Sequence, residues 1–365
     1  MSLDSVWTTL HRWTEEGRWP AAGAVVGSSQ KVEEARLFGR QHVAADSPPV
    51  RDDAIFLIAS PTKPVTALAM MLLVERGEIK LTDSIARYLP DFAGQGKRAI
   101  SIAHCLTHTS GLPDMLPNNA ELRAQSAPLD EFLRGVYQLK PDFAAGTRFQ
   151  YQSMGSLVLS EVLHQVSGRR LADFLQDEIF TPLSMHDTVL GMPPEWEAAQ
   201  GGESKQDRIA EVRLPGDAHS GVWNQAYWRR LGAPWGGLLS TPADWGKLCQ
   251  HLLQIHAGQE GLLSRPTVVA MAANQFAQMP DMPEADRRCR PWGLGWRLNW
   301  PHDTQTFGDL LSPSAYGHWG ATGTMVWIDP ERDQFAVLLT TQPLTFNDSR
   351  HANFTNMVCA AAQVT

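Results

Sequence analysis

The strongest feature of the hydrophobic pattern is an apolar stretch, residues 55–77, which predicts a helix enclosed by protein. Nearly every residue from Val65 to Val74 is apolar, and a helix that is apolar on all sides is buried instead of lying on a surface. Ser60 stands where an N-cap is expected, Pro61 suits the first helical position, and Gly77 suits a left-handed cap at the far end. We therefore expect a central helix that begins at Pro61 and ends before Gly77.

The remaining pattern predicts a helix and two strands at the N-terminus and several strands near the C-terminus. Residues 4–17 have apolar positions at helical spacing, and residues 21–28 and 34–40 are short strand-like runs separated by a polar turn. The segment from Asp83 to Pro194 is helical and rich in loops, whereas residues 195–235 are polar without a clear period. Further expected elements are an amphipathic helix at 157–167, strands at 292–300, 323–330 and 334–341, and a terminal helix at 354–364.

Strands at both ends with helices between them indicate the fold class α/β (α+β), with one antiparallel sheet flanked by helices. Residues 1–82 and 195–365 are expected to form the α/β domain that contains the sheet, and residues 83–194 a mostly helical domain. An active site would then lie in the cleft between these two domains. The length of 365 residues suits two domains with a substantial core.

Composition and charge exclude two classes of partner. The net charge is -8 and no basic stripe is present to neutralise phosphates, so we expect no binding to nucleic acid. No uncharged apolar run reaches the length of about 18 residues that a membrane span requires. The four cysteines form no C-x-x-C pair, and residues 1–19 lack the pattern of a signal peptide. We therefore expect a cytoplasmic protein, unless a native leader has been removed.

A serine and a lysine stand at the mouth of the central helix. Lys63 follows Ser60 by three residues, so one helical turn places the amine beside the hydroxyl. A serine hydroxyl becomes a nucleophile when a neighbouring base takes its proton, and burial in apolar surroundings disfavours the charged form of a lysine. Residues 28–31 match the same Ser-x-x-Lys spacing but lie in a polar turn. The alternative is that Ser60 only caps the helix and Lys63 extends its amine to solvent.

Two later segments carry further candidate chemistry. Tyr151 lies in a compact polar cluster before an apolar helix, and a phenol there can pass protons if a neighbouring cation depresses its pKa. The alternative is a tyrosine that anchors the helix start by packing. Residues 317–329 begin with glycines, and Gly320 and Gly323 allow close backbone approach, so main-chain N–H groups could face an oxyanion. Here the alternative is a bulged edge strand, and His318 alone would more often be structural.

Together these segments resemble the serine β-lactamase and penicillin-binding-protein superfamily, especially its class C β-lactamase, D,D-peptidase and family VIII carboxylesterase branches. The resemblance covers residues 21–341 and implies a β-lactamase/transpeptidase-like fold. The matching segments are Ser60-Pro-Thr-Lys63, Tyr151-Gln-Ser153, His318-Trp-Gly320, residues 106–113 and residues 236–241.

The resemblance also implies a role for each matching residue. Ser60 would be the acylated nucleophile, Lys63 its proton acceptor, and Tyr151 the general base and acid. The oxyanion hole would consist of the backbone N–H groups of Ser60 and Ala321. The remaining substrate-facing or proton-network positions would be Ser153, His318 and Gly320.

Departures from the β-lactamase pattern bear on the substrate. β-Lactamases usually begin the third element with lysine and threonine, which hold the carboxylate of the drug, whereas His318 and Trp319 occupy these places here. A neutral imidazole and an indole bind a carboxylate poorly. Ser153 replaces the asparagine that is usual in class C enzymes. Both changes favour esters, and an apolar pocket could come from Trp223, Trp228 and Trp235, for which core packing is the alternative.

Other chemistries fit the sequence less well. His104, Cys105 and His108 have a spacing that could bind zinc, but no carboxylate or further ligand is evident nearby, so we expect no metal and no other cofactor. No G-x-S-x-G motif is present, which argues against an α/β-hydrolase.

The leading hypothesis is a serine hydrolase that works through an acyl-enzyme, most simply a carboxylesterase for small or medium esters. The alternative within the same mechanism is a β-lactamase, a D,D-carboxypeptidase or a D-aminopeptidase-type amide hydrolase. A non-catalytic binding protein of the same fold is the alternative from another class. The expected partner is a small-molecule ester, lactam or peptide substrate, and the oligomeric state stays open.

Overall fold

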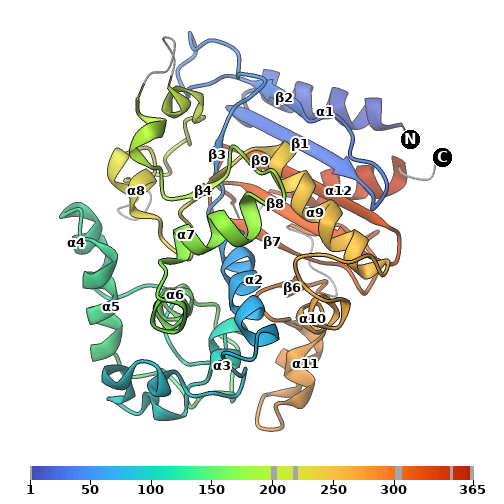
Figure 1. Ribbon diagram of the computed structural model, residues 1–365. Coiled ribbons are helices and arrows are strands. Elements are labelled where there is room, and N and C mark those ends of the chain that lie inside the picture. The colour runs from blue at the N-terminus through green and yellow to red at the C-terminus, as the bar shows by residue number, and fades with distance from the viewer. Residues whose placement is uncertain (1, 199–203, 217–220, 301–305, 346–347, 362–365) are drawn as a thin grey trace.

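A six-stranded antiparallel sheet is built from strands at both ends of the chain and forms a central layer between helices (Figure 1). The computed structural model describes residues 2–198, 204–216, 221–300, 306–345 and 348–361. The N-terminal strand β1 pairs with the C-terminal strand β9, which closes the sheet as expected from the sequence. In spatial order the strands are β2 (Arg36–Gly39), β1 (Ala21–Gly27), β9 (Gln334–Thr340), β8 (Thr324–Asp329), β7 (Tyr316–Gly320) and β6 (Arg297–Leu298).

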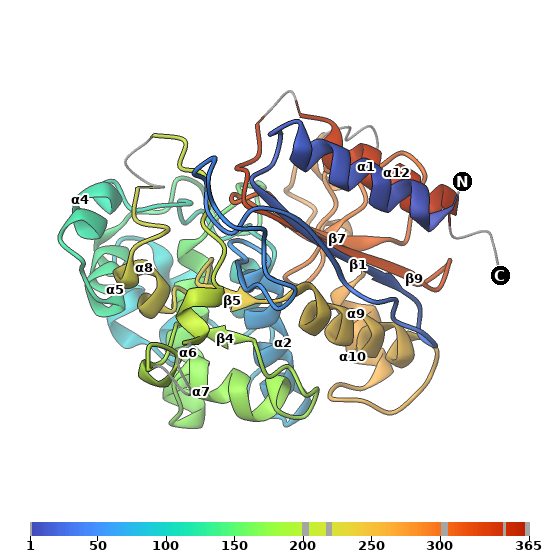
Figure 2. The same cartoon turned by 90° about the horizontal axis from the view of Figure 1, so that it is seen from above.

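Helices cover both faces of this sheet (Figure 2). The terminal helices α1 (Leu3–Glu15) and α12 (Arg350–Ala361) pack together on one face, and α9 (Pro242–His256) packs on β1 and β9 from the other. Strand β1 shows the result, because Ala22 and Ala24 join the core with α1 and α12, whereas Val25 joins the core on the opposite side. A strand that is covered on both faces is apolar throughout, which explains the unbroken run at residues 21–26.

A second, three-stranded sheet leads to the central helix. Its order is β3 (Phe56–Leu57), β5 (Leu238–Ser240) and β4 (Val189–Leu190), and all pairs are antiparallel. Strand β4 belongs to the segment that was expected to be mostly helical, because Val189 and Leu190 pair with β5.

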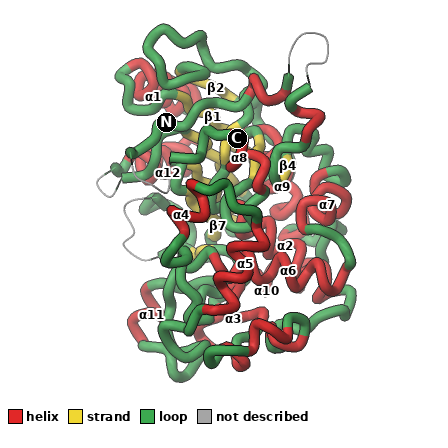
Figure 3. Tube along the Cα trace, turned by 90° about the vertical axis from the view of Figure 1, so that its left-hand side faces the viewer, coloured by secondary structure: helices red, strands yellow, loops and turns green. Residues whose placement is uncertain are grey.

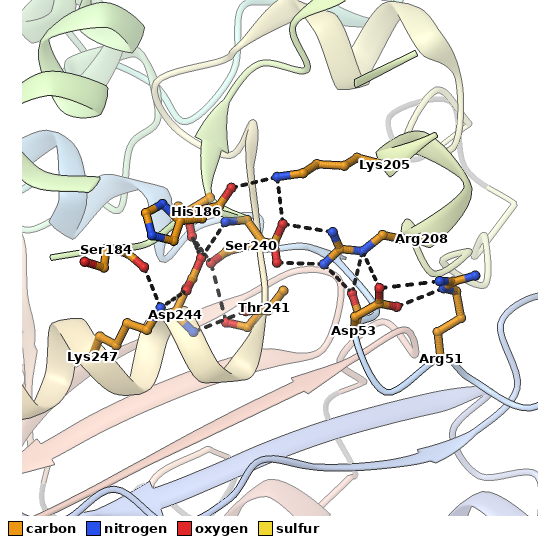
Figure 4. A network of polar contacts seen from close by, with 12 residues as sticks. Arg51, Asp53, Ser184, His186, Lys205, Arg208, Ser240, Thr241, Asp244 and Lys247 are labelled. Atoms are coloured by element: carbon orange, nitrogen blue, oxygen red, sulfur yellow. Dashed lines mark hydrogen bonds and ion pairs between the residues drawn. The ribbon is translucent and has the colours of Figure 1, made fainter. Parts of the chain in front are cut away.

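A polar network fixes the small sheet to helix α9 (Figure 4). The buried carboxylate of Asp244 on α9 accepts hydrogen bonds from the N–H of Asp187 at 2.9 Å and from the hydroxyl of Thr188 at 3.0 Å. Arg208 pairs with Asp187 at 2.7 Å and with Asp53, ahead of β3, at 3.1 Å. Charge-assisted bonds of this kind hold β3 and β4 in a defined position beside α9.

The central helix α2 (Thr62–Glu75) is buried along almost its whole length, as the apolar pattern predicts. The prediction of its first residues was wrong. The helix begins at Thr62, Pro61 is its N-cap, and the Ser60 side chain makes no capping bond. Its far end follows the prediction, because Gly77 adopts a φ of 72° and its N–H and that of Glu78 donate to the last carbonyls of the helix.

Helices of the middle segment surround α2 on the side away from the six-stranded sheet (Figure 3). Among them α6 packs directly on α2 and also contacts α3 and α5. Gly168 ends α6 with a φ of 70°, in agreement with the sequence. The helices of this segment are α3 (Ile102–Leu106), α4 (Asn119–Ala124), α5 (Leu129–Gln138), α6 (Met154–Ser167) and α7 (Leu171–Leu175).

The remaining elements are short. Helices α8 (Ala226–Leu231), α10 (Arg265–Met271) and α11 (Glu284–Cys289) lie in the second half of the chain. A short π-helix is found at Gln176–Phe180, and short 3₁₀ helices are found at Ile85–Arg87, Pro90–Ala93, Lys97–Ala99, Pro194–Trp196, Lys205–Arg208 and Gln275–Gln278.

The helix expected at 157–167 begins earlier, at Met154, and two other expected elements differ more in extent from those observed. The strand expected at 292–300 is reduced to the two residues of β6, and the terminal helix begins at Arg350 instead of Phe354. The expected last residues of that helix, 362–364, lie outside the described residues. In the described part of the chain we find no helix long and apolar enough to cross a bilayer.

Candidate active site

Ser60 lies in the sharp connection between strand β3 and helix α2. The preceding residue, Ala59, has a φ of 57°, which is unusual for a residue other than glycine. The turn is held by the Thr62 hydroxyl, which donates to the carbonyl of Ala59 at 2.6 Å, and by the N–H of Ile58, which donates to Leu238 on β5 at 2.9 Å. The side chain of Ser60 is therefore held at a fixed point in the wall of a cavity, where it is partly exposed.

The amine of Lys63 lies beside the Ser60 hydroxyl, as the three-residue spacing predicts. Its Nζ donates to Ser60 Oγ at 3.1 Å and to the carbonyl of Trp235 at 3.1 Å. Only 4% of the lysine is exposed, so the side chain does not extend to solvent. Burial lowers the pKa of Lys63 to about 8, while the charge of Asp114 opposes this shift. At mildly alkaline pH the amine is thus available in its neutral, proton-accepting form.

Tyr151 joins this pair from the loop that precedes α6. Its ring lies under the Lys63 amine, with 4.6 Å from Nζ to the ring centroid, and its hydroxyl has the Ser60 side chain as a hydrogen-bond partner. Proton transfer by this phenol was expected to depend on a cation that depresses its pKa, and this condition is not met. Burial and the charge of Asp114 raise the pKa of Tyr151 well above 10, and the bond to Ser60 only partly opposes this. The phenol therefore keeps its proton at neutral pH and is a proton donor.

Ser153 is hydrogen-bonded to Asp114, a carboxylate at the site that the sequence analysis did not single out. Its hydroxyl donates to Oδ1 of Asp114 at 2.6 Å, and its N–H donates to the carbonyl of Asp114 at 3.3 Å. Asp114 follows directly after the family-like stretch 106–113, so its position next to that stretch was the available signal. Its pairing with a residue 39 positions later could not be seen from the sequence.

His318 is a buried, neutral group behind Tyr151. Its Nδ1 lies 2.7 Å from the carbonyl of Trp319, which fixes Nδ1 as the donor and leaves Nε2 as an acceptor. Burial, with a contribution from the nearby Lys63, holds the pKa of His318 well below 6.5. The side chain is fully buried and does not line the cavity, so the expectation that it faces the substrate was wrong; Trp319 lines the cavity instead.

The turn after strand β7 lies against the end of β3. A Cβ on Gly320 would lie 2.6 Å from the carbonyl oxygen of Ile58 and 3.0 Å from Pro61, so only glycine allows this approach. Gly320 therefore supports the site and, unlike Ala321, does not line the cavity. The hydroxyl of Thr322 adds a bond to the carbonyl of Leu57 at 2.9 Å.

This approach brings two free backbone donors to one cavity. Ser60 and Ala321 both line it, and within the described residues neither of their N–H groups donates to a protein acceptor. Two unpaired N–H groups that line one cavity together with a serine hydroxyl are candidate donors to an oxyanion.

The cavity has a volume of about 320 Å³ and is open to solvent. Trp228 and Trp235 contact each other with ring centroids 6.3 Å apart, are almost completely buried, and line the cavity, so they are part of the core and of the cavity wall at once. The lining residues are Leu57, Ala59, Ser60, Asp114, Met115, Arg123, Tyr151, Ser153, Trp223, Trp228, Trp235, Gly236, Trp319, Ala321 and Leu344.

The histidines and the cysteine that could have bound zinc have other partners. His104 accepts a hydrogen bond from the N–H of Ser101 at 3.2 Å, and Nδ1 of His108 accepts one from the N–H of Gln152 at 3.1 Å. Cys105 is buried in the core around α2. Among the described residues no group of three or more potential ligands has an arrangement that could hold a metal ion.

Comparisons with known proteins agree with this architecture. The sequence model of the Beta-lactamase family matches residues 10–360. A relative from Escherichia coli (strain K12), named "Putative D-alanyl-D-alanine carboxypeptidase", is 27% identical over 313 residues, which are 79% of this chain and 69% of the relative. A relative of the same name from Salmonella agona (strain SL483) is 28% identical over 315 residues, or 80% of this chain and 70% of the relative.

Solved structures show the same fold at low sequence identity. A penicillin-binding protein homologue from Caulobacter crescentus has a TM-score of 0.80 at 20% identity, covering 98% of this chain and 97% of the other. A family VIII carboxylesterase has a TM-score of 0.78 at 20% identity, with the same coverage of 98% and 97%.

Proposed function

Because the chain belongs to the Beta-lactamase family and is a serine hydrolase of that family, we propose that it is a carboxylesterase for small or medium esters. The observation that carries this proposal is the contact of the Ser60 hydroxyl with two proton-transfer groups, the buried amine of Lys63 at 3.1 Å and the phenol of Tyr151. A site that only bound a ligand would not require this combination of three groups.

We also propose that the site lies between the two expected domains. The cavity wall contains Ser60 and Trp235 from residues 1–82 and 195–365, and Asp114 and Tyr151 from residues 83–194. A cleft between two parts of a chain is a common place for a binding site.

Acylation in this proposal begins when the amine of Lys63, in its neutral form, takes the proton of the Ser60 hydroxyl. The Ser60 oxygen then bonds to the carbonyl carbon of the ester, and the N–H groups of Ser60 and Ala321 stabilise the resulting oxyanion. As the oxyanion collapses, the bond to the alcohol oxygen breaks and that oxygen takes the proton of Tyr151. Tyr151 recovers a proton from the Lys63 ammonium, which returns both groups to their starting forms.

Deacylation repeats these steps with water in place of the alcohol. The Lys63 and Tyr151 pair accepts a proton from water, and the water oxygen attacks the acyl carbonyl. The bond to the Ser60 oxygen breaks, and that oxygen takes the proton back from the pair. The products are the carboxylic acid and the free enzyme with its original protons.

Two features of the site support an ester over a substrate with an obligatory carboxylate. His318 is neutral and buried, and Trp319 occupies the place where β-lactamases have a carboxylate-binding threonine. The tryptophans of the cavity offer an apolar surface to an acyl or alcohol group. The names of the curated relatives favour a second candidate, hydrolysis of D-alanyl peptides, and the same site would suit a β-lactam.

We expect Ser60→Ala to reduce turnover of p-nitrophenyl butyrate by at least about a thousandfold, because the nucleophile is removed. Ser28→Ala is the matched control, since Ser28 belongs to the other Ser-x-x-Lys match and lies outside the cavity. Mass spectrometry after treatment with a fluorophosphonate should show an adduct on Ser60. Unchanged turnover in Ser60→Ala would refute the assignment, and a protein without adduct or turnover would be a binding protein.

A substrate panel separates the remaining candidates. p-Nitrophenyl butyrate, nitrocefin and D-alanyl-D-alanine peptides should be turned over in that order of kcat/KM by a carboxylesterase. Faster turnover of the peptide or of nitrocefin than of the ester would favour the second candidate.

A further inference from the structure

Asp114 places a fixed negative charge at the cavity beside the reacting groups. The residue is exposed, but its position is set by two bonds from Ser153, one from the hydroxyl at 2.6 Å and one from the N–H at 3.3 Å. Within the described residues Ser153 is the one hydrogen-bond donor to this carboxylate. The second carboxylate oxygen is thus available to a group that enters the cavity.

The charge of this carboxylate acts on the catalytic candidates. Asp114 raises the pKa of Lys63, against the larger effect of burial, and adds to the effect of burial in raising the pKa of Tyr151. A substrate whose scissile carbonyl lies beside Ser60 therefore experiences the same field. Opposite charges attract more strongly the closer they lie and the less water separates them.

The two buried histidines near the scissile bond do not cancel this field. His108 and His318 are neutral, because burial holds the pKa of each well below 6.5. The one further charged residue in the described cavity wall is Arg123, whose guanidinium stacks on Trp228 at 4.3 Å from the ring centroid. Arg123 also donates to Sδ of Met115 at 3.8 Å, whereas the carboxylate of Asp114 accepts the hydroxyl of Ser153.

We propose that Asp114 is a specificity-determining residue that binds the ammonium group of a substrate with an amine close to its scissile carbonyl, and that it disfavours a carboxylate there. The substrate class is then an ester or amide of an amino acid with a free amine. This inference rests on the proposed function, because it assumes that the scissile carbonyl binds beside Ser60. This specificity differs from that of a peptidase that binds the terminal carboxylate of its peptide substrate.

The test compares three ethyl esters of similar length that differ in charge: ethyl 3-aminopropanoate, ethyl butanoate and monoethyl succinate. We expect the wild-type protein to favour the cationic over the anionic ester by at least about tenfold in kcat/KM, a preference that added salt reduces. Asp114→Asn should reduce this ratio by about tenfold, and Asp114→Glu should retain most of it. Asp46→Asn is the matched control, because it removes one exposed carboxylate outside the cavity.

The ratio is formed within each variant, so a uniform loss of turnover cancels. An unchanged ratio in Asp114→Asn, or a wild-type preference for the anionic ester, would overturn the inference. If the wild-type protein hydrolyses none of the esters, the proposed function fails, and calorimetric binding of the same esters to Ser60→Ala with and without Asp114→Asn still measures the charge preference. Equal affinities for the cationic and anionic esters in Ser60→Ala would then reject the role of Asp114.

Discussion

At the scale of single residues, Lys63 shows how burial prepares an amine for chemistry. Its Nζ is enclosed between the Ser60 hydroxyl and the Trp235 carbonyl, and neither partner carries a formal charge. The desolvated ammonium is disfavoured, so the pKa of Lys63 falls to about 8, although Asp114 opposes the shift. A lysine in water would stay protonated and could not accept a proton from Ser60.

This pKa predicts the pH dependence of turnover. If neutral Lys63 is the proton acceptor, kcat/KM for a neutral ester should rise about tenfold per pH unit below about 8 and level off above it. Asp114→Asn removes a charge that raises the pKa of Lys63, so the rising limb should move to lower pH. Initial rates, corrected for hydrolysis in the presence of Ser60→Ala, measure the profile. A profile that stays flat across the neutral and mildly alkaline range would contradict this role of Lys63.

Some of these residues could be read from the sequence and others could not. The three-residue spacing on one helix was enough to place Lys63 beside Ser60. The role of Tyr151 was predicted from the resemblance to a family, because its contact with Ser60 depends on the packing of α6 against α2. The pKa of Tyr151 and the position of Asp114 depend on burial and on a contact across 39 positions, and no local pattern reports either one.

At the scale of elements, the close approach of strand β7 to strand β3 positions Ala321 beside Ser60. Gly320 makes this approach possible, because a side chain there would meet the carbonyl oxygen of Ile58 and the ring of Pro61. The same strand is an interior member of the sheet along Tyr316 and Gly317, where it pairs with β6, and its last residues face the β3 turn. One end of a regular strand thus becomes part of the site.

We expect Gly320→Ala to destabilise the protein by about 1–3 kcal/mol, as for other substitutions that overfill a packed site. It should also lower kcat more than it changes KM, because Ala321 would move away from Ser60. Gly94→Ala is the matched control, since no atom lies within 4 Å of a Cβ at that position. Urea denaturation and steady-state kinetics measure the two effects, and equal behaviour of both variants would show that the approach is not required.

The extent of β6 shows why element boundaries were harder to predict than elements. The apolar run 292–300 has the composition of a strand, but a Cβ on Gly293 would lie 2.0 Å from the carbonyl oxygen of Met271, and one on Gly295 would lie 2.3 Å from Ala67. These glycines let the chain pack against α10 and α2, and Gly295 has a φ of 83° that no strand residue adopts. Tertiary packing therefore limits the strand to Arg297 and Leu298.

At the scale of the whole molecule, the six-stranded sheet separates a stabilising layer from the candidate site. Helices α1 and α12 form that layer, and their apolar residues share a core with one face of β1, β8 and β9. The site lies beyond the other face, among residues of α2, β7 and the middle segment. The alternation of strand residues between the two cores was predictable, whereas the pairing of the two terminal helices depends on the closure of the sheet.

We expect Leu10→Ala to lower the free energy of unfolding by about 2–5 kcal/mol, because it leaves a cavity in this layer where the side chain is fully buried. The kcat of the folded fraction should change little, since the sheet lies between Leu10 and the site. Thr8→Ala, at an exposed position of the same helix, is the control. Denaturation curves and turnover at low temperature test both statements, and a large loss of kcat without a loss of stability would contradict them.

The arrangement of α1 and α12 also determines on which side the protein can be immobilised or fused to another protein. The start of α1 and the end of α12 emerge next to each other, on the opposite side of the molecule from α4 and α8, which border the cavity (Figures 1 and 2). A carrier, bead or fused partner joined through either terminus would therefore lie on the side of the molecule opposite α4 and α8. The elements that border the cavity would lie on the far side of the protein from the attachment point, so the attached body would not cover them.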